Sequence, residues 1–175
     1  MEERLGGVIV RGVADGIADI GILEAAVDTA GLQRLEFRAD RLVLVVPRGH
    51  PLAAAGRRRV SIRAAVPHGV IGLAEGSALQ MQWDAALAQR GLRLNYRTRV
   101  PSADAQCRLV AGGAGIALMA EAAARRLGPA ARLRILRLSE PEMTRQLVLC
   151  VRDLEALPAY VQALVTHLRQ APQPR

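Results

Sequence analysis

The sequence predicts an α/β fold with mostly parallel sheets, and three observations support this prediction. Short apolar runs typical of buried strands alternate with segments of helical apolar spacing along almost the whole chain. Glycine or proline stands at the ends of several of these segments, where one element is expected to give way to the next. Apolar residues make up 51% of the 175 residues, which is enough for one sizeable core or two smaller lobes.

The first half of the chain predicts one helix and then a series of strands. Apolar residues recur at helical spacing over residues 3–14, and Gly16 ends this predicted helix. Residues 47–60 are expected to form a loop with one turn of helix at Pro51. Strands are expected at residues 19–23, 32–37, 42–46 and 70–73.

The second half contains two helices that each begin at a serine. Ser77 and Gln80 have the spacing of a capping box, in which the hydroxyl accepts from the third helical amide and the glutamine reaches back. Gly91 is expected to end that helix, and Ser102 is expected to cap the next one. Further strands are expected at 94–100, 116–119, 133–138 and 146–151, with helices at 120–127 and from Pro158, and the tail APQPR is expected to be disordered.

The glycine cluster in DAQCRLVAGGAGIAL, residues 104–118, resembles a phosphate-binding loop at first sight. A dinucleotide-binding glycine loop follows a strand and opens a helix. Here the order is reversed, because the glycines follow a predicted helix and lead into a predicted strand. Gly112 and Gly113 are therefore interpreted as the cap and turn that end the helix.

The charge and cysteine content exclude several function classes. The net charge is +8, and every basic residue is an arginine. The arginines are scattered, with one run at residues 57–59, so a solvated basic surface is favoured over a DNA-binding stripe. Cys107 and Cys150 form no CxxC motif and the three histidines are far apart in sequence, so no metal site and no cofactor are expected. The sequence also shows no signal peptide and no membrane span, and a cytoplasmic location is expected.

The two capping serines are the strongest candidates for a binding site. Each follows a predicted strand directly, and in open α/β sheets ligands bind beyond the carboxyl ends of the strands. The free amides at a helix start suit a carboxylate or another small anion. The alternative is that Ser77 and Ser102 only cap their helices. No nucleophile and base form a coherent catalytic set, and His50 between Gly49 and Pro51 is interpreted as a turn residue.

Five segments in this order resemble one family. The set resembles the effector-binding domain of LysR-type transcriptional regulators, a bacterial family, over nearly the whole chain. The segments are ADGIADIGIL (14–23), DRLVLVVPRGHPLA (40–53), GSALQ (76–80), SADAQCRLVAGGAGIALM (102–119) and LPAYVQALVTHLR (157–169).

The resemblance implies a periplasmic-binding-protein type 2 fold, with two lobes, two crossovers and a small-molecule cleft between the lobes. Residues 1–59 and 142–175 would form the first lobe, and residues 60–141 the second. The resemblance also implies an effector domain that senses a small molecule and that is not an enzyme. The helix-start argument favours a carboxylate as that molecule. The residues expected to line the cleft are Leu23, Ala74, Glu75, Gly76, Ser77, Ser102 and Ala103.

The chain departs from the family pattern at its start. Members of the family begin with a helix-turn-helix, and the effector domain itself begins with a strand and a helix that this chain lacks, so a truncated first lobe is expected. The resemblance implies a homodimer or tetramer in the full-length protein, with DNA contacted only through the helix-turn-helix. The alternatives are a solute-binding protein of the same fold, or an enzyme on this two-lobed scaffold.

Overall fold

The computed structural model describes residues 6–75 and 77–170. The chain forms two compact units, which we call unit 1 (residues 1–40 and 145–175) and unit 2 (residues 41–144). The lobe boundaries expected from the resemblance, at 59/60 and 141/142, stay a prediction, as does the truncation of the first lobe. Gly76, the start of the first predicted helix and the tail APQPR lie outside the described residues.

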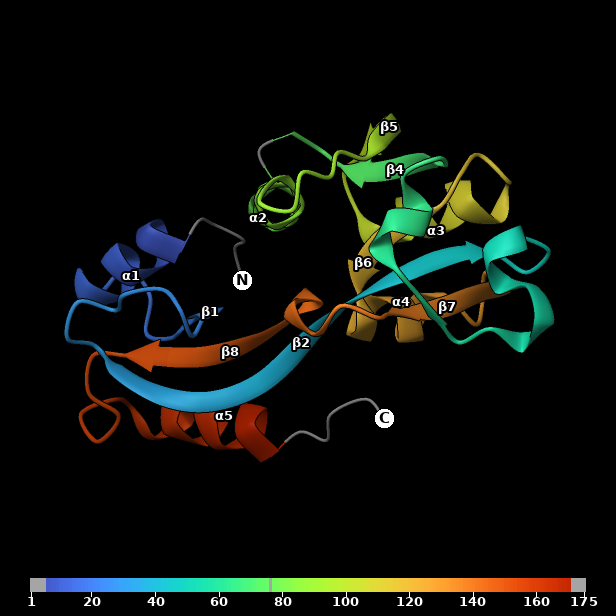
Figure 1. Ribbon diagram of the computed structural model, residues 1–175. Helices are drawn as coiled ribbons and strands as arrows, with labels where there is room; N and C mark the ends of the chain where they lie inside the picture. The colour runs from blue at the N-terminus through green and yellow to red at the C-terminus, as the bar shows by residue number, and fades with distance from the viewer. Residues whose placement is uncertain (1–5, 76, 171–175) are drawn as a thin grey trace. The chain divides into compact units, whose positions relative to one another are not determined.

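Unit 1 contains part of a sheet in which strand β8 (Thr144–Val151) lies between β1 (Gly21–Glu24) and β2 (Gln33–Pro47). Figure 1 shows helix α1 (Gly6–Ala14) on one face of these strands and helix α5 (Ala159–Gln170) on the other. The sheet in unit 1 is therefore covered on both faces.

Consecutive residues of β8 pack into the two apolar layers of unit 1, one on each face of the sheet. Cys150 lies in the cluster that contains Val10 and Val13 of α1, whereas Val151 lies in the cluster that contains Val161 of α5. Successive side chains of a strand point to opposite faces, so a continuous apolar run is what a strand covered on both faces requires.

The two strands expected at 32–37 and 42–46 form one continuous strand, β2, of 15 residues. The expected break was therefore wrong. The charged residues between the two apolar runs stay extended. Asp40 accepts hydrogen bonds from the Nε and Nη2 atoms of Arg145 at 2.9 and 2.7 Å. The Asp40 carboxylate is therefore paired with an arginine of the neighbouring strand β8.

The main core of unit 2 surrounds the apolar end of β2, where Val43–Val46 are fully buried. Strands β6 (Ala117–Ala120) and β7 (Leu133–Leu138) pair with β2 in antiparallel register, and β3 (Arg59–Val60) pairs with β7 in parallel register. A second, parallel pair consists of β4 (Gly69–Leu73) and β5 (Asn95–Val100).

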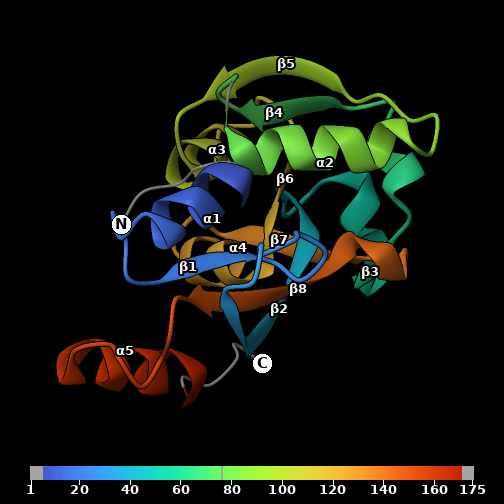
Figure 2. The ribbon, with the colours of Figure 1, turned by 90° about the vertical axis from the view of Figure 1, so that its left-hand side faces the viewer.

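Helices cover these strands of unit 2. Figure 2 shows α2 (Ala78–Ala88) running along the β4–β5 pair. The other helical elements are α3 (Ala103–Ala111), α4 (Glu121–Leu127) and the short 3-10 helices η1 (Pro51–Gly56), η2 (Ile62–Ala65) and η3 (Pro141–Met143). Helix α5 confirms the predicted start near Pro158.

The α/β class is confirmed, but the strand directions are mixed. The pairs β1–β8, β2–β6 and β2–β7 are antiparallel, and β3–β7 and β4–β5 are parallel. An apolar run buried on both faces looks the same in either direction, so the sequence could not distinguish them.

The glycine cluster ends a helix, as the sequence predicts. Gly112 is the C-terminal cap of α3, and Gly113 has a φ of +78°, a conformation that glycine adopts without strain. A Cβ added at Gly115 would lie 2.3 Å from the carbonyl oxygen of Gly69, so this residue lets the chain pass close to β4.

Within the described residues, no helix is long and apolar enough to cross a membrane.

Candidate functional site

Strands β4 and β5 end together, and this brings the two capping serines to one edge. Leu73 lies opposite Val100 in the parallel register, and the Ala74 N–H donates to the Val100 carbonyl oxygen at 2.8 Å. The segments that follow both strands therefore leave the pair at its carboxyl edge. We call this edge, with Ala74, Glu75, Ser77, Ser102 and Ala103, the serine edge.

Ser77 caps helix α2, with its hydroxyl accepting from the Gln80 N–H at 3.4 Å. The second half of the expected capping box is wrong, because the Gln80 side chain does not reach back to Ser77. Its Oε1 accepts from the Leu73 N–H at 2.8 Å instead. Gln80 thus fastens α2 to the end of β4.

Ser102 caps helix α3, with its hydroxyl accepting from the Ala105 N–H at 3.2 Å. Ser102 is exposed and Ala103 is half-buried. The amides of the first helical turn have no acceptor within their own helix, and one serine oxygen serves only one of them. Asp104 in this turn is paired with Arg108, four residues further on, at 2.8 Å.

A polar network lies behind the serine edge, and the sequence analysis missed it. Gln80 Nε2 donates to Asp84 Oδ1 at 3.0 Å and to the Tyr96 hydroxyl at 2.7 Å. The Tyr96 hydroxyl also donates to Asp84 in a short hydrogen bond. Burial, followed by the hydrogen bond and the charge of Asp84, raises the pKa of Tyr96, so its hydroxyl remains a donor. The i, i+4 spacing of Gln80 and Asp84 was the one signal in the sequence.

Arg99 connects this network to the exposed rim of the serine edge. Its Nη1 donates to the Leu73 carbonyl oxygen at 3.3 Å, and its guanidinium lies 4.3 Å from the ring centroid of Tyr96. It also pairs at 3.8 Å with both Asp84 and Glu75. Glu75 is 89% exposed, so its pair with Arg99 contributes little to stability.

Gln106 holds α3 against the two strands beside it. It is 1% exposed, and its Nε2 donates to the carbonyl oxygens of Ile71 in β4 and Leu118 in β6 at 2.8 and 3.4 Å. Its Oε1 is buried without a hydrogen-bond partner in the described part of the chain.

Leu23, the remaining expected ligand contact, belongs to unit 1. It lies in β1 opposite Val148 and is 5% exposed. Its contact with a ligand, like that of the serine-edge residues, stays a prediction.

No metal centre is assembled by the His, Cys, Asp and Glu residues within 6–75 and 77–170. His50 caps η1, with its Nδ1 accepting from the Leu52 N–H at 3.2 Å, which agrees with its interpretation as a turn residue. Burial, and then the charge of neighbouring His68, lowers the pKa of His50.

Comparison with known proteins identifies the family. The family model described as "LysR substrate binding domain" matches residues 2–173. The chain belongs to this family. A LysR domain of this kind is the regulatory part of a transcriptional regulator, and it has the periplasmic-binding-protein type 2-like fold.

A curated relative of the LysR domain comes from Mycobacterium avium and is named "Probable hydrogen peroxide-inducible genes activator". It is 29% identical over 140 residues, which are 79% of this chain and 44% of the relative. The match therefore spans less than half of the curated relative's length.

Two solved structures of low sequence identity share the fold. The CcmR regulatory domain of Synechocystis PCC6803, in complex with 2-PG, has a TM-score of 0.74 and 21% identity, over 94% of this chain and 78% of that one. The effector binding domain of QuiR, in complex with shikimate, has a TM-score of 0.70 and 18% identity, over 95% of this chain and 77% of that one.

Proposed function

We propose that this LysR domain senses a small carboxylate, which binds at the serine edge. The observation that supports this proposal most strongly is the parallel register of β4 and β5, which brings two helix starts to one edge. Both starts present amides without an acceptor in their own helix, at the electropositive end of the helix dipole. A carboxylate can accept from such amides without a cation from the protein.

The ligand of one structural neighbour supports the proposal of an anionic effector. Shikimate, bound to the QuiR domain, is the anion of a carboxylic acid. The expected contact of the effector with Leu23 is a further part of this proposal. The effector would act by binding one arrangement of the regulator better than another, because only such a preference can shift an equilibrium.

Substitutions at Ser102 test the proposal without removing the helix cap. Asp and Asn both cap helices well, but Asp places a negative charge where the carboxylate would lie. We expect Ser102→Asn to retain binding of a carboxylate found in a calorimetric screen of organic acids. We expect Ser102→Asp to lose about tenfold in affinity or more, since two carboxylates about 4 Å apart near a protein surface repel each other by roughly 1–4 kcal/mol.

Two outcomes contradict the carboxylate proposal. One is a screen in which the neutral amides of the same acids stabilise the domain and the acids do not. The other is equal affinity of the Ser102→Asp and Ser102→Asn variants for the acid that binds.

The chain alone is expected not to recognise an operator. Its basic charge supports salt-sensitive binding to any DNA, without a strong preference for sequence. A gel-shift titration at physiological salt, with a fragment of the regulated promoter and a random fragment of equal length, should give similar affinities. A large preference for the promoter fragment would show that this chain itself reads DNA sequence.

The two cysteines of the chain do not support a function that depends on a reactive thiol. Cys107 and Cys150 are 2% and 0% exposed. Burial is the main cause that raises the pKa of both thiols, so the reactive thiolate is disfavoured at neutral pH.

A further inference from the structure

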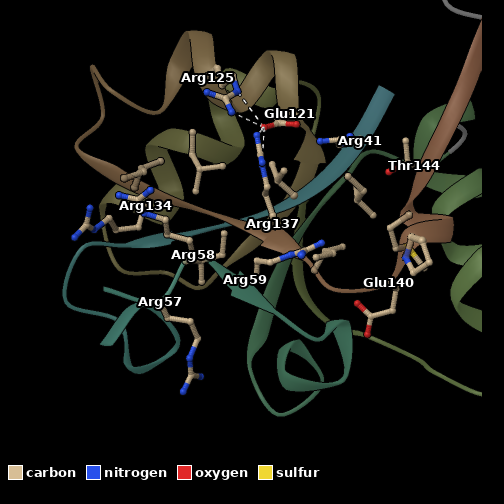
Figure 3. A pocket seen from close by; sticks show the side chains of 18 of the residues that line it. Arg41, Arg57, Arg58, Arg59, Glu121, Arg125, Arg134, Arg137, Glu140 and Thr144 are labelled. Atoms are coloured by element: carbon tan, nitrogen blue, oxygen red, sulfur yellow. Dashed lines mark hydrogen bonds and ion pairs between the residues drawn. The ribbon is translucent and has the colours of Figure 1, made fainter. Parts of the chain in front are cut away.

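Unit 2 contains a concave surface that is lined by seven arginines and by none of the serine-edge residues. The hollow has a volume of about 900 Å³. Figure 3 shows the arginines entering it from several segments. We call it the arginine hollow, defined by Arg41, residues 57–59, Arg125, Arg134 and Arg137.

Strand register concentrates positive charge in the hollow. Arg59 of β3 lies directly opposite Arg137 of β7 in the parallel ladder. Arg137 in turn lies opposite Val43 of β2, and Arg41 is two residues before Val43 on the same side of that strand. Like charges directly opposite each other destabilise a sheet, so this arrangement costs folding free energy unless an anion offsets it.

Glu121 offsets only part of this charge. Its Oε1 accepts from Arg125 Nη2 at 2.6 Å and from Arg137 Nη2 at 3.4 Å, so one carboxylate serves two guanidinium groups (Figure 3). The Glu121 side chain is 10% exposed, whereas that of Arg137 is 48% exposed and remains accessible from the hollow.

Glu140, the other acid in the lining, is committed elsewhere. Its Oε1 accepts from the Ser61 hydroxyl at 2.6 Å and from the Ile62 N–H at 3.1 Å. Burial alone would raise the pKa of Glu140, but these hydrogen bonds outweigh burial and lower it. Glu140 therefore stays ionised and holds η2 rather than the arginines.

The remaining arginines of the hollow are exposed and carry no side-chain hydrogen bond or ion pair to any described residue; they are Arg41, Arg57, Arg58, Arg59 and Arg134. We propose that the arginine hollow binds a small anion that carries two or more phosphate groups. The guanidinium fork matches phosphate oxygens in a bidentate geometry, and several such groups are needed to neutralise this many cations.

The shape and lining favour a small polyphosphate over nucleic acid. The volume lies within the range of pockets for small ligands, roughly 300–1,000 Å³. The lining contains no aromatic residue on which a base could stack. The arginines of the hollow are therefore expected to recognise the phosphate groups of the ligand and not a base.

The test uses the 175-residue chain and inorganic tripolyphosphate as the probe, titrated by calorimetry at physiological salt. The double variant Arg41→Gln with Arg59→Gln removes two cations that have no partner among the described residues. We expect it to bind at least about tenfold more weakly, since each charge-assisted hydrogen bond contributes roughly 1.5–3 kcal/mol. Arg63→Gln with Arg126→Gln is the matched control, because both residues are exposed in unit 2 and neither lines the hollow.

Four outcomes overturn the proposal: no saturable binding of tripolyphosphate, equal weakening by both double variants, orthophosphate binding as tightly as tripolyphosphate, or tripolyphosphate displaced by random duplex DNA at equal phosphate concentration. The Ser102→Asp variant should bind tripolyphosphate normally. Failure of the arginine hollow is thereby distinguished from failure of the carboxylate site.

Discussion

The serine edge and the arginine hollow belong to the same unit, yet they treat their polar groups in opposite ways. Behind the serine edge, Gln80, Asp84 and Tyr96 bond to one another and to the end of β4. In the arginine hollow, Arg59 faces Arg137 across a strand pair. The polar groups behind the serine edge are partners for one another and stabilise the fold. The arginines of the hollow are left with positive charge that an anion from solution can neutralise.

The difference predicts opposite consequences of mutation. Removing a polar group behind the serine edge leaves buried groups without partners, so stability should fall. Removing one of the arginines of the hollow that has no ion pair relieves repulsion, so stability should be kept or should rise while anion binding weakens. This contrast separates a structural network from a binding surface.

The largest effect is expected from Gln80→Leu. The substitution leaves the buried Leu73 N–H without its acceptor and removes one donor from both Asp84 and Tyr96. An unpaired buried group costs about 1–3 kcal/mol, so we expect urea denaturation to show a loss of up to about 3 kcal/mol. Gln89→Leu, at an exposed position of the same segment, is the control, and an equal loss in both variants would mean that the network contributes nothing.

Glu121→Gln should separate stability from anion binding within the hollow. It removes the charged acceptor of Arg125 and Arg137, so the free energy of unfolding should fall by about 1–2 kcal/mol. Affinity for tripolyphosphate should rise, because a competing carboxylate is gone. Calorimetric titration of Glu121→Gln with tripolyphosphate measures the change in affinity, and Glu155→Gln, at an exposed position, is the control. Weaker anion binding by Glu121→Gln would contradict the proposal that the hollow binds an anion.

Ser102→Ala should have a moderate effect at the serine edge. The Ala105 N–H loses its cap, which costs about 1 kcal/mol by thermal or urea unfolding. Ser102→Asn should be nearly neutral, because asparagine supplies an equivalent acceptor. Equal destabilisation by the two substitutions would show that the hydroxyl does more than cap the helix.

The smallest effect is expected from Arg59→Gln alone. Removing a charge opposite Arg137 should stabilise the domain by a few tenths of a kcal/mol, roughly the size of a cross-strand pair. The gain should be present at low ionic strength and disappear near 1 M salt, where charges are screened within about 3 Å. Thermal unfolding at both salt concentrations tests this, and a stabilisation that does not depend on salt would exclude charge repulsion as its cause.

The sequence by itself determined the elements and the helix caps. Apolar periodicity predicted α1, β4, α3 and β7 within a few residues. The spacing of apolar residues along a segment is a local property, and it matches the face or faces that the helix or strand buries. Ser77 and Ser102 were recognisable because a cap depends on atoms within three residues of it. Family membership followed from the order of such local segments.

Tertiary structure alone decided strand direction, the continuity of β2 and the arginine hollow. Asp40 stays within a strand because Arg145, far along the chain, binds it. Arg59 and Arg137 face each other through a strand register that no local pattern encodes. The physical reason is that caps and periodicity are short-range, whereas the position of a charge relative to another charge depends on pairings between distant segments.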